Sequence, residues 1–253
     1  MTYIDTLCHP TDPKIIDKKT IIENALKANI STLGLAGTDH PDWLRQLDLQ
    51  SSFKDFEFIL NFGLHPKWIN NDHLNTENQL NLLKENIHLA HGIGEIGLDY
   101  FSTTDESLRK AQRDAFELQM QLARDTEKPV VIHMVRAHHH SQGILNKFKG
   151  KVRGFLHSFG GKPQLARFYL DAGFHLSIGP HSLRDPNQET IRLIPDDRLL
   201  VESDAPQPTP GRKSTTLPEN LLLIANIVAE IRGVTAERIL EQSKENFREL
   251  YKI

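Results

Sequence analysis

Short apolar runs alternate with longer amphipathic stretches along the chain. Each run is short enough for a buried strand, and each is followed by a helical pattern or a long loop. The pattern therefore predicts eight strands separated by helical or looped segments. The expected strands are Tyr3–Thr6, Thr32–Leu35, Glu57–Asn61, Gly92–Glu95, Val130–His133, Gly154–His157, His175–Ile178 and Leu199–Glu202.

The clearest helical pattern covers residues 104–126. Thr103 and Glu106 have the spacing of a capping box at its start. Its apolar positions recur at helical spacing. They are Leu108, Ala111, Ala115, Leu118 and Leu122.

Two further helices are expected near the end of the chain. Pro218 to Arg232 repeats the amphipathic pattern, and Gly233 is a natural stop for that helix. A final helix, roughly Thr235 to Leu250, is expected to pack on the outside.

Strands that alternate with helices predict a parallel sheet, and eight of them in this length most simply close into a (β/α)8 barrel. An open, doubly wound sheet is the alternative. No Gly-rich phosphate loop follows the first strand to support a dinucleotide site. We expect one domain over residues 1–253, with the Pro-rich segment 205–213 as a loop on the barrel rim.

The composition is that of a globular chain. Its 253 residues include 38% hydrophobic and 25% charged residues, with a formal net charge of −3 that argues against wholesale coating of nucleic acid. The single cysteine, Cys8, fits a reducing compartment and is expected to pack as a small apolar group. With no signal-peptide pattern and no long apolar run, we expect a cytoplasmic protein without a membrane span.

Several predicted strands end in a residue type that binds metal ions. Imidazoles and carboxylates that converge at one barrel mouth are suited to zinc, manganese or a related divalent cation. Glu95 could bridge two such ions. These residues are His9, Glu95, His133, His157 and Asp204, and His65 follows the third strand.

Each of these residues has a simpler explanation when it is taken alone. With 13 histidines in the chain, several fall near strand ends by chance, and Asp204 or Glu95 could be a helix cap or a salt-bridge partner. The same residue classes, however, end strands one, four, five, six and eight. This repetition favours a shared metal site over five unrelated residues.

Other features are weaker. Arg136 could clamp a phosphate or form a salt bridge on the rim. The histidines at 138–140 are interpreted as solvated rim residues, and the turn "SFGG" at 158–161 could hold an anion. The basic cluster before the sixth strand is expected to be a solvated face at the opposite end of the barrel. It comprises Lys147, Lys149, Lys151 and Arg153.

Taken in order, these motifs resemble those of the TatD-like metal-dependent hydrolases. "IDTLCH" resembles the opening D-T-H-C-H of that family, "GLHP" and "GEIGLDY" match as they stand, and "KPVVIHMVRA" resembles P-V-I-I-H-S-R-x-A. "GFLHSFGG" resembles G-x-x-H-x-F-S-G, and "LLVESDAP" resembles L-L-x-E-T-D-A-P. The resemblance covers nearly the whole chain.

The resemblance implies a barrel with one or two divalent ions, zinc, manganese or magnesium, that hydrolyses phosphodiester bonds. The implied substrate is chiefly DNA, often attacked from its 3′ end. Carried over to this chain, His133 and His157 would hold one ion and His9 and Asp204 the other, with Glu95 between them. Asp204 would also take the proton of the attacking water, and Arg136 and His65 would lie near the substrate.

The chain departs from the family pattern at Leu7, where the opening motif has a histidine. His9 therefore stands in a site that lacks one ligand. Met134-Val135 and the segment "KSTTLP", residues 213–218, also differ from the family and bear on substrate contacts. Two alternatives stay open: an ester or amide hydrolase, and a catalytically weak relative that serves as one subunit of a larger bacterial complex.

Overall fold

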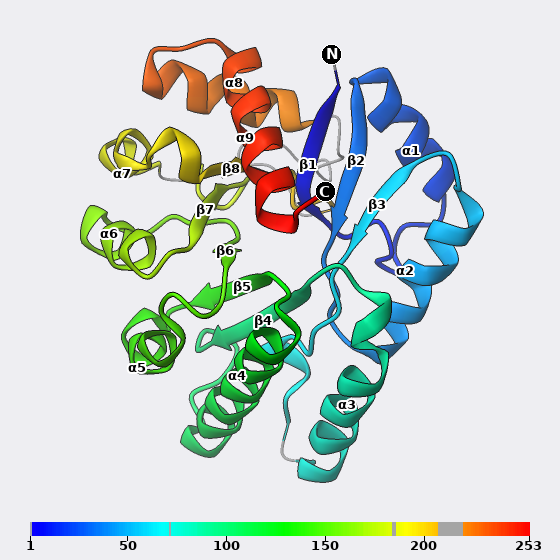
Figure 1. Ribbon diagram of the computed structural model, residues 1–253, viewed down its shortest axis with the longest axis vertical. Helices are drawn as coiled ribbons and strands as arrows, with labels where there is room; N and C mark the ends of the chain where they lie inside the picture. Colours follow the sequence, from blue (N-terminus) through cyan, green and yellow to red (C-terminus); the bar gives the residue numbers. More distant parts are fainter. Residues whose placement is uncertain (1, 71, 184–185, 207–219) are drawn as a thin grey trace.

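A ring of parallel strands forms the centre of the molecule in a computed structural model that describes residues 2–70, 72–183, 186–206 and 220–253 (Figure 1). All eight expected strands are present, ordered β1-β2-β3 in one sheet and β4-β5-β6-β7-β8 in the other. The strands are β1 (Tyr3–Cys8), β2 (Ile30–Leu35), β3 (Glu57–Leu60), β4 (Ile93–Asp99), β5 (Val130–Val135), β6 (Gly154–Leu156), β7 (His175–Ile178) and β8 (Leu199–Val201).

The two sheets join at both seams. A parallel bridge between Asn61 and Gly92 links the end of β3 to the start of β4. At the other seam, the backbone N–H of Asp204 donates to the carbonyl of Leu7 at 3.0 Å, and the N–H of His9 donates to the carbonyl of Ala205 at 2.6 Å. The sheet is therefore a closed (β/α)8 barrel, as the sequence predicts.

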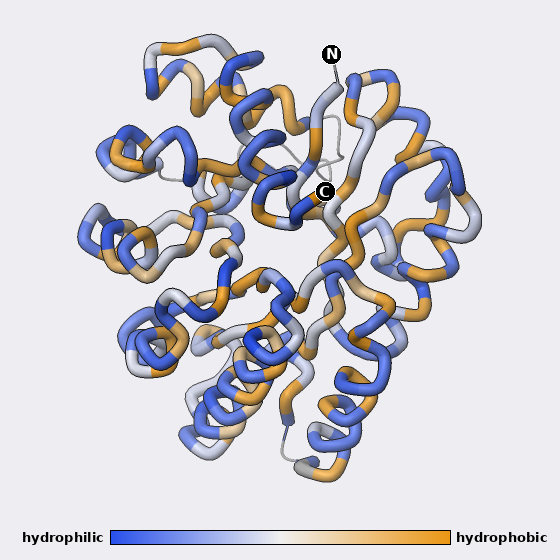
Figure 2. Tube along the Cα trace, viewed as in Figure 1, coloured by the Kyte–Doolittle hydropathy of each residue, from blue (hydrophilic) through white to orange (hydrophobic). Residues whose placement is uncertain are grey.

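Helices surround the strands, and apolar residues concentrate on the strands and on the helix faces turned toward them (Figure 2). No helix in the described part of the chain has the length and apolar character needed to cross a membrane. The helices are α1 (Lys18–Lys27), α2 (His40–Ser52), α3 (His73–Asn86), α4 (Glu106–Thr126), α5 (His138–Phe148), α6 (Pro163–Asp171), α7 (Gln188–Leu193), α8 (Leu221–Arg232) and α9 (Ala236–Tyr251), with short 3-10 helices η1 (Pro66–Trp68), η2 (Ile87–Leu89) and η3 (Asp196–Arg198).

The final helix differs from its expected position. In Figure 1, α9 lies across the end of the ring that faces the viewer instead of in the outer layer. Phe247, Leu250 and Tyr251 pack in one buried cluster with residues of the strands, and the Tyr251 hydroxyl donates to Asn61 Oδ1 at 2.6 Å. The prediction of outside packing was wrong because this apolar face fills the amino-terminal mouth of the barrel, which leaves the other mouth for chemistry.

Two local predictions also need correction. Asp105 rather than Thr103 caps α4, since its carboxylate accepts from the N–H groups of Ser107 and Leu108. The fourth strand does not end at Glu95 but continues to Asp99, because residues 97–99 pair with β5. In contrast, Gly233 ends α8 in the left-handed conformation, with φ of 70°, as predicted.

Candidate metal centre

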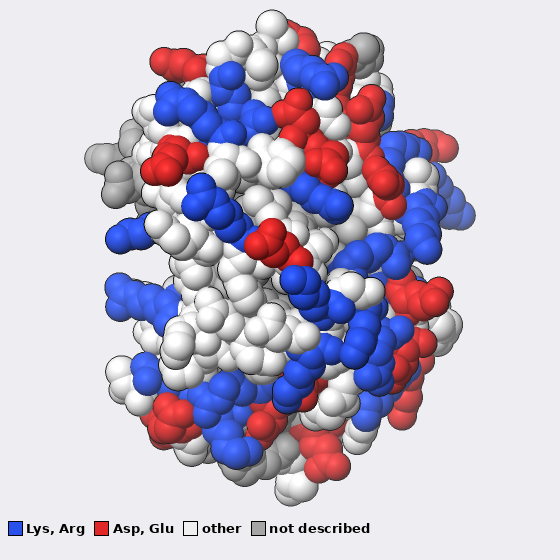
Figure 3. Space-filling model, turned by 60° about the vertical axis from the view of Figure 1, so that its left-hand side comes forward, with Lys and Arg blue, Asp and Glu red and all other residues white. Residues whose placement is uncertain are grey.

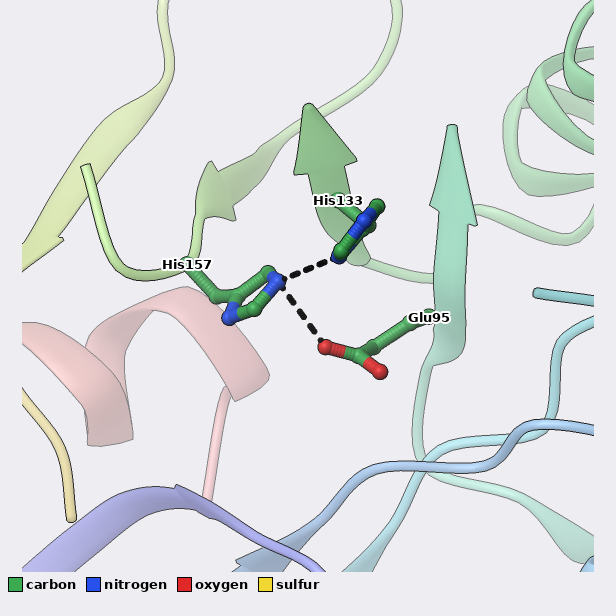
Figure 4. A group of neighbouring side chains, drawn as sticks. All are labelled: Glu95, His133 and His157. Carbon is green, nitrogen blue, oxygen red and sulfur yellow. Dashed lines mark hydrogen bonds and ion pairs between the residues drawn. The ribbon is translucent and has the colours of Figure 1, made fainter. Parts of the chain in front are cut away.

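Glu95, His133 and His157 come together at the carboxyl-terminal mouth of the barrel (Figure 4). Glu95 projects from within β4, His133 from β5, and His157 from the first residue after β6. His157 Nε2 lies 3.0 Å from Glu95 Oε1 and 2.9 Å from His133 Nδ1. One ligand atom from each residue lies within 4.8 Å of the other two, so a single ion can reach all three.

The chemistry of this trio fits a divalent cation. Donor atoms around a tetrahedral zinc lie about 3.3 Å apart, and the contacts of His157 with Glu95 and His133, at 3.0 Å and 2.9 Å, are within a few tenths of an ångström of that spacing. Glu95 Oε1 is buried and forms no hydrogen bond within the described residues, because its 3.0 Å contact with His157 Nε2 lacks hydrogen-bond geometry. Buried polar atoms are rarely left without a partner, and an ion would satisfy this one.

Each imidazole of the trio has a carboxylate beyond its other ring nitrogen. His133 Nε2 lies 3.5 Å from Asp99 Oδ2, and His157 Nδ1 lies 3.5 Å from Glu202 Oε1. Carboxylates in this place orient metal-binding histidines and increase their basicity. Sequence reasoning missed both, although Asp99 stands in "GEIGLDY" and Glu202 in "LLVESDAP".

His9 and Asp204 lie on the other side of Glu95. His9 Nε2 is 3.3 Å from Asp204 Oδ1 and 3.7 Å from Glu95 Oε2. Leu7 is fully buried among apolar side chains of the barrel interior, so it contributes packing and no ligand atom. This side therefore has two terminal donors where the first side has two imidazoles and two supporting carboxylates.

His65 lies in the same cavity and is held by its own turn. Its Nδ1 accepts the backbone N–H of Lys67 at 3.0 Å, which leaves Nε2–H as a donor 3.8 Å from Glu95 Oε2. The ring packs against His133 at a centroid distance of 4.4 Å. Burial, together with the neighbouring His133, lowers the pKa of His65 well below its usual value, so a neutral ring faces the cavity.

Arg136 stands at the rim of the cavity, directly after β5. Its guanidinium carbon lies 4.6 Å from the centre of the Phe101 ring. Among the described residues, no carboxylate lies within 4 Å of Arg136, so the rim salt bridge that the sequence left open is not formed there. The guanidinium is therefore placed at the cavity mouth by an aromatic face, with its N–H groups available to a ligand.

The carboxylates give this end of the barrel a strong preference for positive charge. Burial alone would lower the pKa of His157, but the charges of Glu95 and Glu202 raise it to about 10. His9 behaves in the same way, because Glu95 and Asp204 outweigh burial and raise its pKa to about 9. A divalent ion would supply that positive charge and displace the protons.

Three residues that line the cavity have strained backbones. Arg136, Ser158 and Asp204 have φ values of 53°, 46° and 50°, and each follows a barrel strand. Left-handed conformations of such residues cost about 1–3 kcal/mol each and gather at functional sites. The cavity itself has a volume of about 480 Å³. Strain at three separate strand ends around one cavity supports it as the candidate functional site.

The weaker sequence features have mixed outcomes. His139 and His140 are exposed at the rim as expected, whereas His138 is partly buried with its Nδ1 2.8 Å from the Tyr169 hydroxyl. The basic cluster includes Lys147, which pairs with Glu117 at 2.7 Å, and Cys8 is buried as predicted. The start predicted for α8 at Pro218, the segment 213–218 and most of the rim loop 205–213 lie outside the described residues.

A closed parallel barrel with a carboxylate and imidazoles gathered at its carboxyl-terminal mouth is the architecture of metal-dependent barrel hydrolases. A family model described as TatD related DNase matches residues 4–252. The uncharacterized metal-dependent hydrolase YabD of Bacillus subtilis is 31% identical, with 94% of this chain and 93% of that protein covered. The chain belongs to the TatD family, and it is a metal-dependent hydrolase.

Two other matches agree with this assignment. The human deoxyribonuclease TATDN3 is 26% identical, with 98% of this chain and 94% of that protein covered. The crystal structure of YJJV, a TatD homologue from Escherichia coli K12, superposes with a TM-score of 0.87 at 24% identity, covering 99% of this chain and 98% of that one. The structural likeness shows that the fold is shared.

Proposed function

We propose that this chain is a metal-dependent phosphodiesterase that acts on DNA and removes nucleotides from a 3′ end. The observation that carries the proposal is the trio Glu95, His133 and His157 at the mouth of a cavity whose rim bears Arg136. The name of the human relative, a deoxyribonuclease, supports DNA as the substrate. The buried free thiol of Cys8 supports a reducing location such as the cytoplasm.

In this proposal Glu95, His133 and His157 would hold the first ion, and His9 and Asp204 would hold a second one together with Glu95. A bound ion of this kind lowers the pKa of water and polarises a phosphoryl oxygen. Asp99 and Glu202, whose carboxylate oxygens lie 3.5 Å from the outer nitrogens of His133 and His157, would orient the two rings when the ion is bound.

Asp204 is the proposed proton acceptor. Burial would raise the pKa of its carboxyl, but the hydrogen bond from His9 and nearby imidazoles lower it, so the group is ionised at neutral pH. Its place in the cavity, 3.3 Å from His9, allows it to take a proton from the attacking water.

Arg136 and His65 are the proposed substrate contacts. The guanidinium of Arg136 can donate two parallel hydrogen bonds to phosphate oxygens. His65 offers a neutral Nε2–H donor deeper in the cavity. Together they would neutralise and orient the phosphoryl group as negative charge builds up on its oxygens.

The test is hydrolysis of 5′-labelled single-stranded DNA by the purified protein after loading with zinc, manganese or magnesium. We expect a ladder that shortens from the 3′ end and that disappears with a chelator. A matched variant, Asp204→Asn, should retain the fold and lose turnover. Hydrolysis of ester or amide substrates with none of DNA would contradict the proposal.

A further inference from the structure

A second groove continues from the metal cavity. It has a volume of about 480 Å³, within the range of sites that bind small ligands. His9 and Lys67 line both this groove and the metal cavity, so the two are adjacent and share a wall. Beyond that wall the groove runs along the loops after β1 and β2 and reaches Trp68.

Trp68 presents an aromatic face to this groove. Trp68 is 46% exposed, whereas the other tryptophan of the chain, Trp43, is only 1% exposed. The ammonium of Lys67 lies 5.3 Å from the centre of the Trp68 ring. An exposed ring beside a cation is the arrangement with which proteins stack a nucleobase and hold its phosphate.

The position of Trp68 is fixed relative to the metal trio. Both Lys67 and Trp68 belong to η1, where the N–H of Trp68 donates to the carbonyl of His65 at 3.0 Å and Lys67 N–H donates to His65 Nδ1. His65 in turn packs on His133 of the trio. One short turn therefore ties the groove's aromatic residue to the site of hydrolysis.

The groove also offers cations that other groups do not neutralise. Within the described residues, neither Lys14 nor Lys67 has its ammonium within 4 Å of a carboxylate. Three aspartates also line the groove, and each is already engaged. Asp12 accepts from the backbone N–H of Lys14 at 2.8 Å, Asp39 accepts from the backbone N–H of Asp42 at 3.0 Å, and Asp42 pairs with Arg45 at 3.0 Å. The two lysines are thus available to phosphate oxygens.

Binding of a polyanion must be local in this protein. The formal net charge is −3. The face in Figure 3 carries Lys and Arg side chains on either side of an uncharged area, with Asp and Glu side chains among them. A short groove with an aromatic ring and two lysines suits a few unpaired nucleotides better than a rigid duplex, whose bases are stacked on each other.

We propose that this groove is a second nucleotide-binding subsite, which holds the part of a single-stranded DNA that extends away from the scissile phosphodiester. Trp68 stacks one base there, and Lys67 contacts the phosphate at the junction with the metal cavity. The inference rests on the proposed phosphodiesterase activity for its orientation, and its binding test is independent of cleavage.

Tryptophan fluorescence of the full-length protein tests binding. The chain has two tryptophans, and Trp43 is buried at 1% exposure, so quenching reports on Trp68. In a chelator that prevents cleavage, we expect an oligothymidylate of eight nucleotides to quench this emission, and a blunt duplex not to do so. No quenching by the single strand, or equal quenching by the duplex, would overturn the inference.

Kinetics of the metal-loaded protein test the role of the groove. For the wild type, we expect kcat/KM to rise from a thymidine dinucleotide to the eight-nucleotide strand, and Trp68→Ala to reduce that gain on the order of 10-fold. Trp68→Phe should keep most of the gain in kcat/KM, because an aromatic ring remains to stack on the base. An undiminished gain in Trp68→Ala would overturn the inference.

The salt dependence of DNA binding reports how many phosphate groups the protein contacts with positive charges. Lys67→Gln should reduce the slope of log Kd against log salt by about 0.7, the value for one phosphate contact on a single strand. The matched variant Lys149→Gln, at the opposite end of the barrel, should leave the slope unchanged. Equal slopes in the wild type and both variants would show that Lys67 does not contact the bound strand. Quenching of Trp68 without hydrolysis of DNA would support the groove as a binding site and reject the proposed phosphodiesterase activity.

Discussion

The two sides of Glu95 differ in how completely they are built. On one side, His133 and His157 face the carboxylate and each has a further carboxylate 3.5 Å from its outer nitrogen. On the other side, His9 and Asp204 lie 3.3 Å apart, and Leu7 packs into the barrel core. A metal position depends on the residues that orient its ligands as much as on the ligands. The first side has both kinds of residue, so we expect it to bind an ion more tightly.

The largest expected effect follows from His133→Ala. Removal of one of the three proposed ligands on the better-built side should abolish tight metal binding and reduce DNA hydrolysis by at least 100-fold. Metal content by mass spectrometry and turnover on single-stranded DNA measure the two effects. His140→Ala, an equal truncation on the exposed rim, is the control and should retain the metal. A His133→Ala protein with wild-type metal content would show that the side with His133 and His157 is not the one that binds the tighter ion.

Leu7→His should increase the metal affinity of the side formed by His9 and Asp204. Leu7 is buried and its carbonyl accepts from the backbone N–H of Asp204, so an imidazole at this position can add a third terminal ligand if the barrel wall accommodates the ring. We expect affinity for a second ion to rise by about 10-fold or more. Titration with manganese, with activity followed at each step, measures this. Thermal unfolding of the variant shows whether the ring is tolerated, and a folded variant without tighter binding would argue that this side is never used.

Arg136→Lys separates phosphate recognition from simple charge. The charge remains but the two parallel hydrogen bonds are lost, so kcat/KM on DNA should fall about 10-fold. Arg124→Lys, on the helix surface where Arg124 pairs with Asp125, is the matched control. An unchanged rate for Arg136→Lys would favour an ester or amide substrate over a phosphodiester.

A last prediction concerns stability and not activity, at Asp5, which supports the weaker side. Its carboxylate accepts from the N–H and the hydroxyl of Ser203, next to Asp204, and burial raises its pKa to about 7. The Asp5 carboxyl therefore keeps its proton in the folded protein at pH values where the unfolded chain, with a pKa near 4, has lost it. This difference stabilises the folded state. The stabilisation is complete below pH 4 and is lost as the pH rises through 7.

Asp5→Asn should remove this dependence. Between pH 5 and pH 8, the unfolding free energy of the wild type should fall by about 3 kcal/mol more than that of the variant. Urea unfolding in a chelator at the two pH values gives the difference. Parallel pH profiles would mean that Asp5 does not titrate in this range.

Much of this arrangement follows from the sequence because it depends on local patterns. The eight apolar runs predict eight strands, and closure into a barrel follows from their number and parallel order. Glu95, His133 and His157 could be identified from motifs at predicted strand ends. Those three side chains meet in the structure because parallel strands present their carboxyl ends to one mouth.

What could not be predicted depends on tertiary contacts. The amphipathic pattern of α9 shows an apolar face but not that this face fills the end of the barrel. Asp99 and Glu202 look like ordinary acidic residues until their distances to His133 and His157 are known. The groove at Trp68 likewise arises from loops that are far apart in the chain, such as those bearing Lys14 and Lys67.

Equilibrium dialysis of the wild-type protein against zinc or manganese tests the difference between the two sides most directly. The number of ions per chain is measured at rising free-metal concentrations, with His9→Ala dialysed in parallel. We expect one tight ion per chain that persists in His9→Ala, and a second ion that binds only at much higher concentration and is lost in that variant. Two ions of equal, tight affinity in the wild type, or loss of the tight ion in His9→Ala, would contradict the account.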